Sequence, residues 1–70
     1  METYQVDQSS QIKQIGYDKQ IKKLRVWFNS GSCYDYYEVP ERIWDSLKNA
    51  KSKGTFFSEN IKGLYTYKKV

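Results

Sequence analysis

The segment from Gly31 to Pro40, Gly-Ser-Cys-Tyr-Asp-Tyr-Tyr-Glu-Val-Pro, constrains the fold more than any other stretch of the chain. It opens with a glycine, which tolerates positive φ, and closes with a proline, which has no backbone N–H. Between these two residues, aromatic and polar side chains alternate as they do along a strand. The segment therefore predicts a turn, a strand and the start of a helix in close succession.

The residues before this segment predict two further strands. Apolar side chains alternate in two runs, which are Ile15 with Tyr17 and Leu24 with Val26 and Phe28. Ile12 is one residue out of step, so either a β-bulge or a later strand start is expected there. The three strands predict an antiparallel meander from 12 to 39. In its last strand Tyr34 and Tyr36 should face the core or a groove at its margin, while Asp35 should lie on a solvated face.

Two helical segments are expected after the meander. Pro40 suits a first helical turn, and Ile43, Leu47 and Ala50 form one apolar stripe beside Trp44, so the main helix should span about 40–50. Ser58 as an N-cap and Gly63 as a stop predict a short helical turn over about 58–62. Its packing residues should be Phe56, Phe57, Ile61 and Leu64. The last residues, 65–70, form either an edge strand or a packed tail.

The predicted fold class is therefore α+β, with a three-stranded antiparallel meander packed by one main helix and a short helical turn. Residues 1–8 are expected as an extended lead-in and residues 9–70 as a single domain. A chain of 70 residues buries a thin core, so several of its twelve aromatic residues must be structural.

Composition narrows the function classes. The chain has no His and a single Cys33, so it lacks the commonest general base and the usual zinc ligands. We therefore expect no enzyme activity, no metal and no cofactor, and Cys33 as a passive strand residue. The absence of a disulfide framework, a signal peptide and a long apolar run predicts a cytoplasmic protein without a membrane partner.

Basic residues gather in the C-terminal part of the sequence. Residues 46–70 contain Glu59 and six lysines, at positions 48, 51, 53, 62, 68 and 69. If these lysines converge, they would contact phosphates without reading a sequence. The alternative is an ordinary solvated face.

The aromatic residues give a second set of candidates. Tyr34 and Tyr36 either stack on bases or fill the core, whereas Trp27 and Tyr37, with Arg25, could form an exposed platform. The alternatives for that platform are a cross-strand pair or a patch that closes an oligomer. The candidate ligand-binding residues are Arg25, Trp27, Tyr34, Tyr36, Tyr37, Lys48, Lys51, Lys62, Tyr65, Tyr67 and Lys68.

An ordered set of residues resembles the KTSC domain family, a module found alone in bacterial and phage proteins and at the C-terminus of some lysyl-tRNA synthetases. The set comprises Ser9, Ser10, Ile12, Gly16, Tyr17, Asp18, Leu24, Val26, Phe28, Gly31, Tyr34, Tyr36, Val39, Pro40, Leu47, Ala50, Ser52, Gly54, Phe57, Ile61, Tyr65 and Tyr67. The family has no assigned activity, and the resemblance implies RNA binding only through the attachment to a synthetase.

These observations together predict a non-catalytic binding module. Its ligand would be RNA or another phosphate-bearing molecule, such as a nucleotide, held by aromatic stacking and lysine contacts. One alternative is a small phage-type inhibitor that oligomerises and sequesters a nucleotide-derived signal or blocks a host protein. Another is a protein-interaction module, with Trp27, Tyr37 and Trp44 as anchors.

Overall fold

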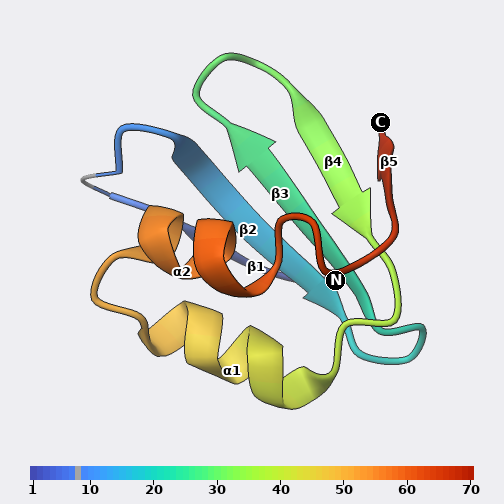
Figure 1. Cartoon of the computed structure of the whole chain (residues 1–70). Helices are drawn as coiled ribbons and strands as arrows, with labels where there is room; N and C mark the ends of the chain where they lie inside the picture. Colours follow the sequence, from blue (N-terminus) through green and yellow to red (C-terminus); the bar gives the residue numbers. More distant parts are fainter. Residues whose placement is uncertain (8) are drawn as a thin grey trace.

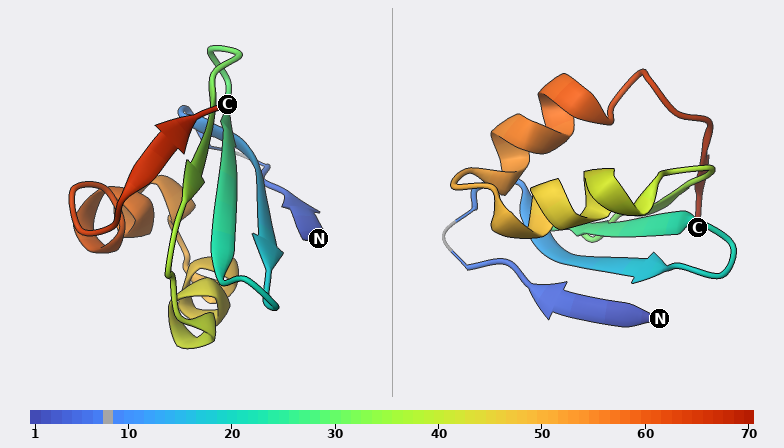
Figure 2. Two further views of the ribbon diagram at one scale, coloured as in Figure 1. Left: turned by 90° about the vertical axis from the view of Figure 1, so that its right-hand side faces the viewer. Right: turned by 90° about the horizontal axis from the view of Figure 1, so that it is seen from below.

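The computed structural model describes residues 1–7 and 9–70, which form an antiparallel sheet and two helices (Figure 1). The strands are β1 (Glu2–Gln5), β2 (Ile12–Asp18), β3 (Lys23–Phe28), β4 (Cys33–Tyr36) and β5 (Tyr67–Lys69), paired in that order. The helices are α1 (Glu41–Asn49) and α2 (Lys53–Asn60). Both helices lie on one side of the sheet, which leaves the other face without a covering layer (Figure 2).

The predicted antiparallel meander is present as β2, β3 and β4, but the sheet has five strands rather than three. The first additional strand, β1, comes from the expected lead-in, where Thr3 lies opposite Gly16. Gln8, the last residue of that lead-in, lies outside the described residues. The other additional strand, β5, is the edge strand that was one of the two alternatives for residues 65–70, and it pairs with β4 through Tyr36 and Tyr67. Both strands are short and solvent-exposed, so they lack the alternation of buried residues by which strands are recognised.

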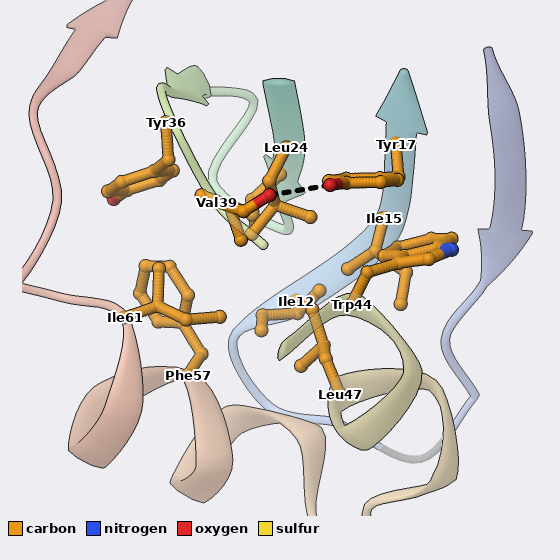
Figure 3. Close-up of a cluster of buried hydrophobic side chains, with 11 residues drawn as sticks. Ile12, Ile15, Tyr17, Leu24, Tyr36, Val39, Trp44, Leu47, Phe57 and Ile61 are labelled. Atoms are coloured by element: carbon orange, nitrogen blue, oxygen red, sulfur yellow. Dashed lines mark hydrogen bonds between the residues drawn. The ribbon is translucent and has the colours of Figure 1, made fainter. Parts of the chain in front are cut away.

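The β-bulge expected near Ile12 is present. The register of β2 against β3 shifts between Ile12 and Gln14, which brings Ile12 onto the same side as Ile15. Both isoleucines are fully buried in one core that joins the sheet to the two helices (Figure 3). The other members of this core are Tyr17, Leu24, Val26, Tyr36, Val39, Trp44, Leu47, Phe57 and Ile61.

The predicted main helix is α1, and its start is fixed by the end of β4. The Tyr17 hydroxyl donates to the carbonyl oxygen of Val39 at 2.5 Å (Figure 3). The backbone N–H of Val39 donates to the carbonyl oxygen of Lys22 at 2.9 Å. Pro40 follows as the N-cap residue, where its missing N–H leaves no orphan donor. These two bonds place α1 across the sheet.

The second helix differs from the prediction. It begins at Lys53 instead of Ser58, because the hydroxyl of Ser52 accepts a hydrogen bond from the N–H of Thr55 at 3.3 Å. Phe57 and Ile61 are buried as expected, but Leu64 is 66% exposed and does not pack. Gly63, with φ of 81°, lies just beyond the helix end. Among the described residues, neither helix has the length and apolar character needed to cross a membrane.

Candidate functional site

A groove of about 670 Å³ opens at the margin of the core, between β4, β5, the turn that joins β3 to β4, and α2. We call it the aromatic groove, because five aromatic side chains line it. They are Phe28, Tyr34, Tyr36, Phe57 and Tyr67. The groove lies on the side of the sheet that carries the helices. Figure 3 shows two of the lining side chains, with the ring of Tyr36 above that of Phe57.

The five rings contact one another in a closed circuit. The ring centroids of Phe28 and Tyr34 are 5.7 Å apart, those of Tyr34 and Tyr67 5.6 Å, and those of Tyr67 and Tyr36 5.7 Å. Phe57 completes the circuit at 5.4 Å from Tyr36 and 5.6 Å from Phe28. Edge-to-face and tilted pairs such as these hold rings in fixed orientations. The wall of the groove is therefore preformed in the absence of a ligand.

The depth of the rings in this wall is graded. Tyr36 is 5% exposed, Tyr34 is half-buried, and Tyr67 is exposed on the edge strand. Burial, with smaller contributions from the hydroxyls of Tyr34 and Tyr67, raises the pKa of Tyr36 to about 12. Tyr36 is therefore neutral at neutral pH, and its ring is part of the hydrophobic core. Phe28 is half-buried as well, so Phe28, Tyr34 and Tyr67 are the rings that a ligand can reach.

Polar groups line the rest of the aromatic groove. Lys62 comes from the turn after α2, and Ser10, Asn29 and Ser32 come from the segments around the hairpin. The Asn29 amide nitrogen donates to the backbone oxygen of Ser9 at 3.0 Å, which fixes the side chain and leaves its oxygen as an acceptor. The groove thus combines flat apolar surface, hydrogen-bonding groups and one positive charge.

The aromatic groove brings together four of the residues predicted from sequence, Tyr34, Tyr36, Lys62 and Tyr67. It also contains residues that the sequence did not single out. Phe28 was expected only as core, although as the last inward residue of its strand it lies at the margin. Phe57 was placed next to a helical turn that starts too late, so its position over β4 was not foreseen. Tyr65 is half-buried and packs against the core outside the groove lining.

The opposite, helix-free face of the sheet carries Arg25, which is already paired. Its guanidinium donates from Nε and Nη2 to the two carboxylate oxygens of Asp35, at 2.6 and 2.9 Å. Lys23 Nζ lies 3.7 Å from the same carboxylate. Asp35 is consequently only 4% exposed, so the expectation of a solvated aspartate was wrong. Two basic side chains from the neighbouring strand cover it.

Trp27 and Tyr37 fall on this face by strand alternation, near opposite ends of β4. Trp27 is opposite Cys33, and Tyr37 lies four residues further along the chain, or about 13 Å. The guanidinium carbon of Arg25 is 5.9 Å from the ring centroid of Trp27. The Trp27 ring also covers Gly16, where an added Cβ would come within 3.1 Å of it. Trp27 is therefore half-buried by structural contacts.

Trp44 was a proposed anchor for a protein partner, and this assignment was wrong. The residue is 1% exposed, stacked on Tyr17 with 5.4 Å between ring centroids. Its indole N–H donates to the carboxylate of Glu2 at 3.2 Å. A side chain this deep belongs to the core and offers no surface to a partner.

The six C-terminal lysines do not gather at one place. Lys62 lines the aromatic groove, whereas Lys51 and Lys53 line a separate polar hollow of about 460 Å³ near the start of α2. Asp7 and Glu59 line that hollow too, which disfavours an anion there. The other three are Lys48, held between Glu2 and Asp45, Lys68, opposite Asp35, and Lys69, opposite Tyr34.

Among the residues that the structure describes, no reactive group stands out beside the aromatic groove. Burial raises the pKa of the Cys33 thiol, so its thiolate is disfavoured at neutral pH. Across residues 1–7 and 9–70, no three His, Cys, Asp or Glu side chains are grouped to hold a metal ion. The arrangement suits reversible binding of a flat, polar-edged molecule.

Replacing Asp35 with Asn should destabilise the domain by about 1.5 to 3 kcal/mol at neutral pH, the usual worth of a charge-assisted hydrogen bond. The hydrogen bond from Arg25 lowers the pKa of Asp35, so the carboxylate stabilises the fold above its unfolded-state pKa. That contribution is lost as the pH falls through the folded-state pKa. Urea unfolding of the variant and of an exposed control, Glu59→Gln, across acidic pH measures it. An unchanged difference at all pH values would contradict the assignment.

Comparison with known proteins places the chain. The KTSC domain profile matches residues 8–69. A lysine–tRNA ligase from Nostoc punctiforme is 38% identical over 63 residues, which is 90% of this chain. The chain spans only 11% of that ligase. A protein from Tsukamurella paurometabola is 40% identical over 55 residues, covering 79% of this chain and 82% of its own length.

The fold agrees with these sequence matches. The crystal structure of a KTSC domain protein from Yersinia pestis superposes with a TM-score of 0.93 and 38% identity. The match covers 99% of this chain and 96% of that one, so both edge strands fall within the shared fold. The resemblance seen in the sequence is thereby confirmed, and the chain belongs to the KTSC domain family.

Proposed function

We propose that this protein is a non-catalytic binding module whose aromatic groove takes RNA or another phosphate-bearing ligand with a planar ring. The observation that carries the proposal is the circuit of five rings with Lys62 beside it. Bases stack on exposed aromatic side chains with little sequence preference, at about 1 to 3 kcal/mol per base. Lys62 would contact a phosphate as a point charge.

RNA is a reasonable ligand class because the same module occurs within lysine–tRNA ligases. By their name, those enzymes join lysine to a tRNA. A small module attached to such an enzyme would gain from holding the RNA. The support is one of association, so the binding itself has to be measured.

The helix-free face is the rival site. Arg25, Trp27, Tyr37 and Lys68 remain candidates there, but a phosphate would have to compete with Asp35 for the Arg25 guanidinium. The aromatic groove offers Lys62 and three reachable rings without breaking an ion pair. The alternative ligands are a protein partner or a second copy of this chain. For these, Trp27 and Tyr37 are the anchor candidates, since Trp44 is buried. Mass measured in solution tests the oligomer.

Titration with single-stranded RNA distinguishes the two faces. Tyr34→Leu should weaken binding by about 5- to 150-fold, which corresponds to about 1 to 3 kcal/mol of lost stacking. Lys62→Met should weaken it by about tenfold or more. The matched variants Tyr37→Leu and Lys68→Met, on the helix-free face, should bind as the parent does. The reverse pattern would move the site to the helix-free face, and no binding by the parent would reject an RNA ligand.

A further inference from the structure

We infer that the aromatic groove holds one nucleotide at a time and does not track a polynucleotide. This inference rests on the proposed function. The shared chemistry is one base, one sugar and one phosphate, supplied either by a free mononucleotide or by a single nucleotide turned out of a strand. Three properties of the groove lead to this conclusion, namely its charge, its size and the arrangement of its polar groups.

The charge of the groove is too small for a track. Proteins that follow a single strand line the path with several cations, each meeting a phosphate. Among the described residues lining the aromatic groove, Lys62 is the only lysine or arginine. Lys51 and Lys53 line the other hollow, and Lys68 is paired in register with Asp35 on β4. Lys69 lies opposite Tyr34 on the exposed edge strand but is not among the residues that line the groove. One phosphate contact is therefore what the groove can provide.

The size of the groove agrees with the charge. Its volume of about 670 Å³ falls within the range of about 300 to 1,000 Å³ that is usual for pockets that take small molecules. The closed circuit of rings bounds it on the sheet side, and α2 bounds it through Phe57 and Ser58. On its remaining side the groove is open to solvent. Of the reachable rings, Phe28 and Tyr34 meet edge to face, so they do not form one continuous flat surface for several stacked bases.

The polar groups of the groove lie in two places, which suits the separate base and phosphate of a nucleotide. Lys62 lies beyond the end of α2, whereas Asn29, Ser30 and Ser32 come from the hairpin between β3 and β4. Tyr34 and Phe28 flank that hairpin and contact each other edge to face. A base against Tyr34 would meet hydroxyl and amide groups at its edge, while its phosphate would meet Lys62. This arrangement predicts that base, sugar and phosphate all contribute to affinity.

Calorimetric titration of the intact chain tests the inference. The probes are the mononucleotides AMP and UMP, the matching nucleosides, and a single-stranded RNA of about 16 nucleotides, the upper site size of a single-strand-binding OB fold. Each is measured at several salt concentrations. For the strand we expect log K to fall against log salt with a slope of about −0.7, the value for one phosphate on a single strand. The nucleosides carry no phosphate, so their log K should not depend on salt in this way. Lys62→Met should abolish this slope, while an exposed control, Lys19→Met, should retain it.

The possible outcomes distinguish a free nucleotide from a nucleotide within a strand. They also distinguish failure of this inference from failure of the proposed function. Binding of mononucleotides with affinity within a few fold of the strand supports a free nucleotide as ligand. Binding of the strand alone, still with a slope of about −0.7, supports one nucleotide within a strand. A slope of several times that value would overturn the inference but retain the proposed function. The same holds if affinity rises with strand length by more than the number of nucleotides that one site could choose among. No binding of any probe would reject both.

Discussion

Replacement of Trp44 with Ala should destabilise the domain by about 3 to 5 kcal/mol. Trp44 is 1% exposed, stacks on Tyr17 and donates its indole N–H to Glu2, so it joins α1 to β1 and β2. Truncating a buried Trp or Phe to Ala costs about 3 to 5 kcal/mol. A domain of 70 residues is stable by only about 4 to 10 kcal/mol. The loss is a large part of that total.

Circular dichroism and urea unfolding measure this effect. Leu64→Ala is the matched control, because Leu64 is also a large apolar residue of the sequence but is 66% exposed. It should change the free energy of unfolding by less than about 0.5 kcal/mol. If Trp44→Ala were as stable as Leu64→Ala, the described position of Trp44 in the core would be wrong. Binding is not the readout here, since Trp44 lies away from the aromatic groove.

The second large effect is expected at Tyr36. Tyr36→Ala should destabilise the domain by about 3 to 5 kcal/mol, because its ring is 5% exposed and contacts Phe57 and Tyr67. Tyr36→Phe keeps the ring and should remain folded. Thermal melting of the two variants separates loss of packing from loss of the hydroxyl. Equal melting temperatures for Tyr36→Ala and the parent would show that the ring is not part of the core.

The same residue gives a pH dependence. Its pKa is raised to about 12 in the folded state, against an ordinary value near 10, so burial of the neutral hydroxyl stabilises the fold below the unfolded pKa. Stability should then fall as the pH rises from about 10 towards 12. Tyr36→Phe should lose less stability over that interval than the parent does. An identical alkaline decline in both would assign the effect to other groups.

Much of the sheet could be predicted from sequence because its central strands alternate clearly. Leu24 and Val26 mark β3, and Pro40 marks the start of α1. The edge strands were harder to recognise, since every residue of β1 and β5 is exposed and carries no burial pattern. β1 was missed, and β5 was only one of two alternatives for residues 65–70. The start of α2 was misplaced because Ser58 was taken as its N-cap, although Ser52, six residues earlier, is the residue that caps it.

The candidate site could be predicted in part for a similar reason. The alternation in β4 correctly placed Tyr34 and Tyr36 on the inner side, at the margin of the core. That Tyr67 completes the wall depends on the pairing of β5 with β4, which a strand of three exposed residues does not reveal. The burial of Asp35 depends on its register opposite Arg25. Cross-strand register, more than composition, decides which residues meet.

The most direct test of this account is a chemical-shift titration by NMR with AMP, or with the short RNA if only a strand binds. We predict that ring protons of Tyr34 and Tyr67 and the signals of Lys62 shift together, with one common dissociation constant. The indole N–H of Trp27, on the helix-free face, should stay unchanged. Shifts that centre on Trp27 and Arg25, with the aromatic groove silent, would contradict the account.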